Sequence, residues 1–67
     1  MSKLKQIREV KNLSQSKLAE ISGVDIRNIQ YYEQGYRDIN KAQAVTLHKI
    51  ARALECNIED ILNLEEV

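Results

Sequence analysis

The sequence predicts an all-α fold, a compact bundle of five short helices in a single domain that spans residues 1–67. Apolar residues recur every three to four positions in several segments, which is the period of an amphipathic helix. Residues that favour helix caps stand where these segments begin, and no segment shows the alternation of a strand. The predicted helices cover residues 2–11, 40–54 and 57–64, and a pair of helices lies within residues 14–35.

The centre of the chain predicts two helices joined by a tight turn. Ser14 caps the first helix, because a Ser side chain accepts a hydrogen bond from an amide of the first turn. Gly23 ends that helix, since Gly adopts a left-handed conformation at little steric cost, and Val24 is the apolar residue of the turn. Asp25 then caps the second helix, and Gly35 ends it. This arrangement is a helix-turn-helix motif.

The flanking helices supply the apolar surface that two short helices lack. Ser2 is the predicted cap of the first helix, and Asn40 is the predicted cap of the fourth. One face of the fourth helix carries Ala44, Leu47, Ile50, Ala51 and Leu54. Asn57 is the predicted cap of the last helix. Its apolar residues are Ile58, Ile61 and Leu62.

The second helix of the motif has two chemically different faces. At about 100° per residue, Ile29 and Tyr32 share one face, with Glu33 close to them. The opposite face carries Arg27, Asn28, Tyr31 and Gln34. Arg and Asn side chains pair with guanine and adenine edges, and an aromatic ring contacts a thymine methyl group. A solvated polar face is the alternative, but the preceding helix and turn favour a helix that reads the DNA major groove.

Three further residues are candidates for contacts with the DNA backbone. Gln15 stands at the N-terminus of the first motif helix, where free amides and the helix dipole favour a phosphate. Tyr36 and Arg37 leave the second motif helix and can reach phosphates, which position a protein without reading sequence. For Arg37, a solvent-facing charge is an equal alternative.

Charge is distributed unevenly along a chain whose net charge is zero. Residues 1–37 carry seven basic and four acidic side chains, whereas residues 38–67 carry three basic and six acidic ones. The half that contains the motif is therefore basic and can attract phosphate despite the neutral total.

Composition and motifs argue against several classes of function. The single Cys56 and single His48 provide no metal-site spacing, and no cofactor or small-molecule ligand is indicated. The chain shows no phosphate-cradling glycine loop and no nucleophile with a plausible base, so we expect no enzyme. No apolar run approaches the ~20 residues that span a membrane, and we expect a cytoplasmic protein.

Several segments match a known family in order and spacing. The segments are S-Q-x-x-L-A-x-x-S-G-V-D, I-x-x-x-E-x-G, L-x-K-I-A-x-A-L and I-x-D-I-L. From about Leu4 to Leu62 the chain resembles the phage repressor and Cro-type helix-turn-helix family, with its lambda repressor-like fold. The resemblance implies a protein encoded by a bacterium or phage, whose second motif helix lies in the major groove. The implied base-contacting residues are Ile26, Arg27, Asn28 and Tyr31.

The resemblance also assigns roles to residues outside that face. It implies that Gln15 contacts phosphate and base, and that Arg8 forms a structural ion pair with Glu33. Three positions depart from the family pattern. Ile26 is apolar where a polar residue is common, Ser22 is polar where an apolar residue is common, and Glu55 replaces a frequent Gly.

These observations predict a sequence-specific DNA-binding transcriptional regulator, a repressor that binds a palindromic operator in double-stranded DNA as a homodimer. The candidate dimer surface comprises Ile58, Ile61, Leu62 and Leu64, although these residues could instead complete the core. The alternative function is a protein-interaction module, such as an antitoxin or a partner-regulated accessory protein.

Overall fold

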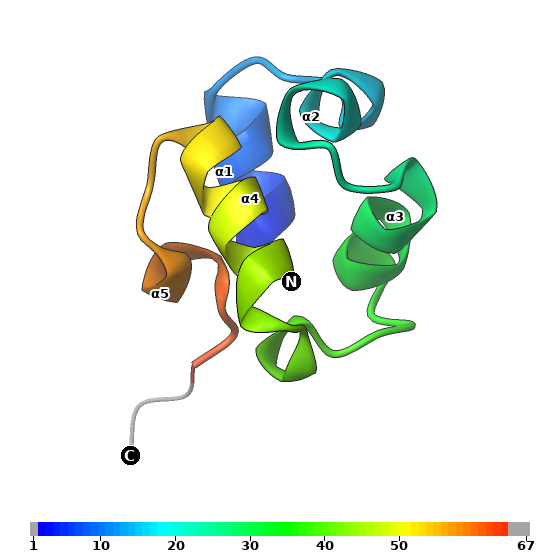
Figure 1. The fold of residues 1–67 in the computed structure, drawn as a ribbon, viewed down its shortest axis with the longest axis vertical. Coiled ribbons are helices and arrows are strands. Elements are labelled where there is room, and N and C mark those ends of the chain that lie inside the picture. The colour runs from blue at the N-terminus through cyan, green and yellow to red at the C-terminus, as the bar shows by residue number, and fades with distance from the viewer. Residues whose placement is uncertain (1, 65–67) are drawn as a thin grey trace.

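The computed structural model describes residues 2–64, and within them the chain is helical and contains no strand. The elements are α1 (Lys3–Val10), α2 (Gln15–Ser22), α3 (Ile26–Gln34), the 3-10 turn η1 (Ile39–Lys41), α4 (Ala44–Leu54) and α5 (Ile58–Ile61). The predicted all-α class is therefore confirmed. Figure 1 shows α2 and α3 on one side of α1 and α4, and α5 on the other.

The core lies between α4 and the helices around it. α4 packs against α2 and α5, while α1 packs against α3 and α5. Leu18 of α2, Ile29 of α3 and Ile61 of α5 are fully buried in this core. Burying an aliphatic side chain of this size stabilises a fold by about 1.5–3 kcal/mol. The remaining buried apolar residues are Leu4, Val24, Ile39, Leu47, Ile50, Ala51 and Leu54.

The predicted start of the fourth helix at residue 40 is wrong. α4 begins at Ala44, after an extended Ala42 (φ −68°, ψ 154°). Asp38 caps the preceding turn instead, because its carboxylate accepts a hydrogen bond from the Asn40 amide at 2.9 Å. Ile39 is 2% exposed, and burial of this side chain holds the turn against the core. Ala44, predicted to lie on the buried face, is exposed at the start of α4.

The last helix is shorter than the predicted span of 57–64. α5 is a single turn after Asn57, whose amide donates to the Asp60 carboxylate at 2.9 Å. Leu62 then adopts an extended conformation. The side chain of Asn40 pairs with both backbone groups of Asn63, accepting at 2.8 Å and donating at 2.9 Å. These bonds satisfy the Asn63 backbone outside a helix, so nothing requires α5 to continue.

Glu55 ends α4 in the left-handed conformation, with φ 56° and ψ 45°. This is the position where the sequence departs from a frequent Gly. A non-Gly residue in this region costs roughly 1–2 kcal/mol because its Cβ crowds the following carbonyl oxygen. Replacement of the frequent Gly by Glu55 therefore places this cost in the backbone of the C-cap.

Candidate nucleic-acid interface

Local capping positions the pair α2 and α3. The Ser14 hydroxyl accepts from the Lys17 amide at 3.0 Å, and the Asp25 carboxylate accepts from the Arg27 amide at 2.8 Å. Gly23 and Gly35 end the two helices with φ values of 74° and 84°. All four predicted helix ends are therefore observed.

Val24 and Ser22 complete the turn between the two helices. Val24 is buried, as expected for the apolar residue of the turn. The Ser22 hydroxyl accepts from the Val24 amide at 3.2 Å, which explains a polar residue at a position that is often apolar. Burial of the Val24 side chain and the hydrogen bond to Ser22 therefore both stabilise the turn.

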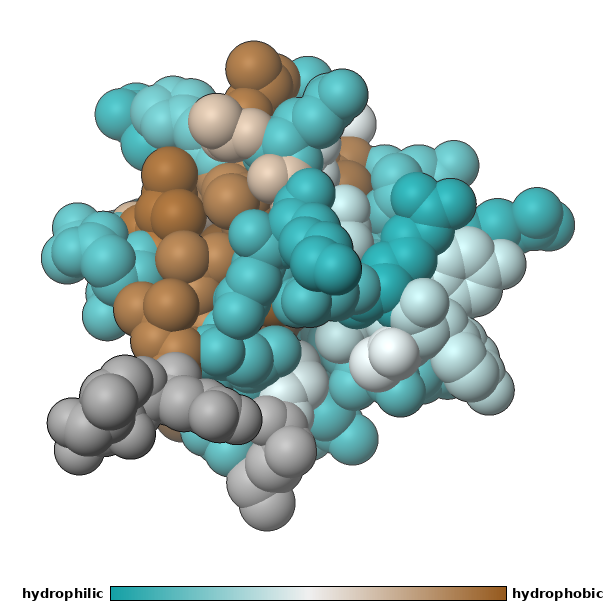
Figure 2. Space-filling model, turned by 90° about the horizontal axis from the view of Figure 1, so that it is seen from below, coloured by the Kyte–Doolittle hydropathy of each residue, from teal (hydrophilic) through white to brown (hydrophobic). Residues whose placement is uncertain are grey.

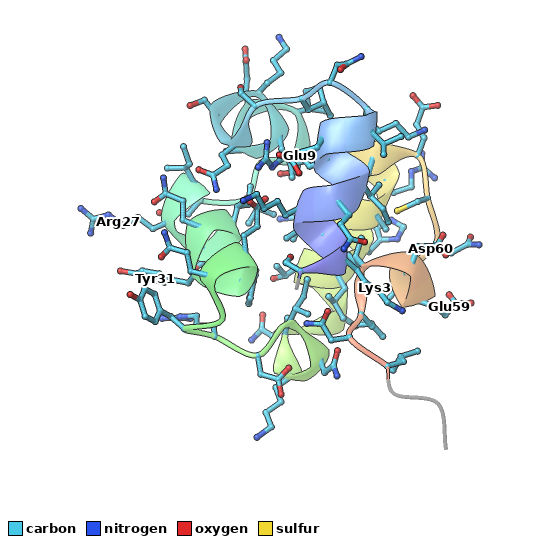
Figure 3. All side chains as sticks on the ribbon, turned by 180° about the vertical axis from the view of Figure 1, so that it is seen from behind. Lys3, Glu9, Arg27, Tyr31, Glu59 and Asp60 are labelled. Atoms are coloured by element: carbon cyan, nitrogen blue, oxygen red, sulfur yellow. The ribbon has the colours of Figure 1, made fainter. Side chains whose placement is uncertain are left out.

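α3 presents one face to the core and the other to solvent. Ile29 is fully buried, and Tyr32 packs against the core. Figure 3 shows Arg27 and Tyr31 projecting from the side of α3 that faces away from α1. Arg27 is exposed, whereas Asn28 and Tyr31 are half-buried. The two faces deduced from the helical angle are therefore present.

Ile26, the remaining candidate base-contacting residue, stands at the first position of α3 and is half-buried. Because Ile26 is only half-buried, part of its apolar surface is free to contact another molecule. The chemically matching group in the major groove is the thymine methyl group.

A buried ion pair ties α1 to the C-terminal half of α3. Arg8 Nε donates to Glu33 Oε2 at 2.7 Å, and Arg8 Nη2 donates to Oε1 at 3.0 Å. The third donor, Nη1, binds the Leu13 carbonyl at 2.7 Å. The Arg8 and Glu33 side chains are 10% and 3% exposed. Hydrogen bonding to the Glu33 carboxylate raises the pKa of Arg8 above its ordinary value.

Gln15 belongs to this network rather than projecting freely toward a phosphate. Its amide nitrogen donates to Glu33 Oε1 at 3.0 Å, and its amide oxygen accepts from Gln30 Nε2 at 3.4 Å. Sequence reasoning missed Gln30. Its three-residue spacing from Glu33 on α3 was the available signal, but the contact with Gln15 depends on how α2 and α3 pack.

Tyr36 and Arg37 return toward α3 after Gly35. Their amides both donate to the Tyr31 carbonyl, at 2.9 and 3.3 Å. The Tyr31 and Tyr36 rings meet edge-on, with centroids 6.1 Å apart and planes at 74°. The Arg37 guanidinium carbon lies 5.7 Å from the Tyr31 ring centroid. The sequence predicted Tyr36 and Arg37 as phosphate contacts and did not indicate that they touch Tyr31.

The apolar residues near the C-terminus divide between core and surface. Ile61 is fully buried, so it completes the core and is removed from the candidate dimer surface. Ile58 and Leu62 are half-buried against the core, and Leu64 is 55% exposed. Figure 2 shows apolar surface gathered on the side that carries α5, while the side that carries α3 is hydrophilic to neutral.

Labelled charges also lie on different sides of the molecule. Figure 3 shows Glu59 and Asp60 on α5, on the side away from Arg27. The acidic surface of α5 is therefore separated from the outer face of α3. Within residues 2–64, no three His, Cys, Asp or Glu residues are grouped as a metal site. None of the helices described for these residues is long and apolar enough to span a membrane.

Comparisons with known proteins agree with this geometry. A helix-turn-helix family model matches residues 4–61. The chain is also 37% identical, over 65 residues, to an uncharacterised HTH-type transcriptional regulator, y4wC, of Sinorhizobium fredii (strain NBRC 101917 / NGR234). That alignment covers 91% of this chain and 43% of the relative, so the chain spans less than half of the relative's length. The match over most of the chain, together with the capped helix pair, shows that the protein belongs to the Cro/C1-type helix-turn-helix family of DNA-binding domains.

Proposed function

We propose that this protein is a sequence-specific transcriptional regulator, a repressor that binds operator DNA through the major groove. The observation that carries the proposal is the outer face of α3, where Arg27 and Tyr31 project away from the bundle. Asn28 and Ile26 stand beside them on the same helix. Together they offer a bidentate donor, an amide and two apolar contacts, which are the groups that distinguish base pairs in the major groove. The relative named as a transcriptional regulator supports the same assignment.

Positioning of α3 is the second support for base reading. Specific recognition needs a helix whose orientation is held, because a shift of the helix moves every side chain relative to the bases. The Arg8–Glu33 pair and the Gln15–Glu33 bond connect three helices at one carboxylate. In the proposed complex, half-buried Gln15, the Tyr36 hydroxyl and Arg37 contact the DNA backbone. These contacts set the register of the protein without reading sequence.

We propose further that two copies bind together as a homodimer. One copy has only modest basicity, and a dimer doubles the number of contacts with DNA. The apolar surface around Ile58, Leu62 and Leu64 lies on the α5 side, away from α3. Two copies can therefore meet there without covering their α3 faces. Two-fold symmetry would then match operator half-sites about 34 Å apart.

Selection from a random duplex pool tests this function. We expect an enriched palindrome whose affinity falls steeply with salt, because bound Lys and Arg side chains release counterions. Enrichment of an asymmetric site would contradict the homodimer but keep base reading. Weak, salt-sensitive binding with no enriched sequence would overturn the proposal, and a protein partner would then be the binding target to seek.

A further inference from the structure

Arg37 and Tyr36 form a small cluster with Tyr31 at the end of α3. The Arg37 guanidinium lies over the Tyr31 ring at 5.7 Å, and the Tyr36 ring approaches at 74° with a centroid distance of 6.1 Å. Tyr36 is 76% exposed, so its contact with Tyr31 does not come from burial in the core. The cluster is a surface feature built next to the face of α3 that carries Arg27.

The backbone after α3 brings these side chains together. Gly35 has φ 84°, a left-handed conformation that turns the chain back over the last turn of the helix. The amides of Tyr36 and Arg37 then donate to the Tyr31 carbonyl at 2.9 and 3.3 Å. The backbone of Tyr36 and Arg37 is therefore hydrogen-bonded to Tyr31, and the side chains of both residues contact the Tyr31 ring.

These contacts restrict the Tyr31 side chain before any ligand arrives. An aromatic residue on a helix surface can occupy more than one rotamer, and binding has to select one of them. A guanidinium over the ring face is attracted by the ring quadrupole, and an edge-on ring adds a second contact. Both contacts therefore favour the orientation that the ring has on the outer side of α3.

We propose that Arg37 is a positioning residue for base reading, which holds the Tyr31 ring so that Tyr31 recognises the methyl group of a thymine. This inference rests on the proposed function. With the guanidinium against one ring face, the rest of the ring offers apolar surface, and the thymine methyl is the apolar group that the major groove presents. Arg37 thus contributes to sequence recognition through Tyr31 in addition to any contact with phosphate.

Thymine-to-uracil substitution in the selected operator tests the proposal, because it removes only the methyl group. We expect uracil at this position in one half-site to weaken binding of the unmodified protein by about fourfold, the value of one buried methyl. Tyr31→Ala should abolish this difference. Arg37→Lys keeps the charge but loses the planar group, and it should reduce the difference to about twofold or less.

Charge removal needs its own control. Lys41 lines the same surface hollow as Arg37 but belongs to η1. Arg37→Gln and Lys41→Gln each remove one positive charge. Only Arg37→Gln should lower the ratio of the affinity for the thymine operator to the affinity for the uracil operator. If Arg37→Lys and Arg37→Gln both kept the affinity ratio of the unmodified protein, the positioning role would be overturned. Arg37 would then be a contact to the DNA backbone.

A second readout needs no DNA. The ring current of Tyr31 should shift the Arg37 side-chain protons upfield in the NMR spectrum of the free protein, and Tyr31→Leu should remove that shift. Unshifted Arg37 protons would overturn the ring contact and the inference with it. An upfield shift in a protein that enriches no operator would instead show that the cluster forms and that the proposed base reading, with this inference, is wrong.

Discussion

The outer face of α3 and the surface beside α5 lie on opposite sides of the bundle and differ in how they are built (Figure 1). The α3 side carries directional hydrogen-bonding groups, and a buried ion pair secures the helix behind them. The α5 side combines apolar surface with the exposed carboxylates of Glu59 and Asp60 around a helix of one turn. Directional groups suit the reading of base edges, whereas apolar contact depends mainly on area. The two sides therefore differ in chemistry, as the proposed separation of a DNA-binding surface from a dimer surface requires.

Breaking the Arg8–Glu33 pair should have the largest effect. Glu33→Ala leaves the Arg8 guanidinium buried without its carboxylate, so we expect a loss of about 3–5 kcal/mol in the free energy of unfolding. Urea denaturation followed by circular dichroism measures this. Glu20→Ala is the control, because Glu20 pairs with Lys17 at 3.4 Å while 70% exposed. Similar denaturation midpoints for the two variants would contradict a stabilising role for the buried pair.

Removing a base-reading side chain should affect binding and leave folding intact. Arg27 is exposed, so Arg27→Ala should leave the denaturation midpoint unchanged. On the selected operator we expect it to weaken binding by about 1–3 kcal/mol and to relax one base position. Titration of the operator and of random duplex DNA at one salt concentration measures this. Equal losses on both would assign Arg27 to the backbone instead of a base.

The opposite side is tested by placing a charge on the apolar surface. Burying the exposed part of Leu64 in a two-fold dimer is worth on the order of 1 kcal/mol per copy. Both copies carry the substitution, so Leu64→Lys should raise the dimer dissociation constant about thirtyfold. Analytical ultracentrifugation measures the dissociation constant. Ile21→Lys is a matched control, since Ile21 is 51% exposed on α2, on the other side of the bundle. A larger increase in the dissociation constant for Ile21→Lys than for Leu64→Lys would assign the dimer surface to α2.

The smallest expected effect lies where α4 leads to α5. Glu55 holds a left-handed conformation, with φ 56°, that Gly adopts without steric cost, so Glu55→Gly should stabilise the fold by up to about 1 kcal/mol. Thermal denaturation measures the change. Asn12, with φ 59°, provides the comparison, because Asn tolerates this region and Asn12→Gly should gain less. A loss of stability in Glu55→Gly would show that the Glu side chain outweighs the strain.

Helix ends were largely predictable because they depend on neighbouring residues. Ser14 and Asp25 each bond an amide within three positions, and Gly23 and Gly35 each need only a local left-handed conformation. Asn40 is the informative exception. Asn is a favourable cap residue, yet here Asp38 caps the turn, and the Asn40 side chain binds the backbone of Asn63, 23 positions away. This distant hydrogen-bond partner competes with the local preference of Asn for a helix cap. The residues around position 40 give no indication of it.

By itself, the sequence determined the helix periods, most of the caps, the two faces of α3 and, through family resemblance, the pairing of Arg8 with Glu33. Only the tertiary structure decided that Gln15 bonds to Gln30, that Ile61 belongs to the core and that Arg37 lies over the Tyr31 ring. The physical reason is the distance along the chain over which each interaction acts. Periodicity and capping are interactions over a few residues, whereas these three placements depend on the angle at which helices pack and on the direction of the chain after Gly35.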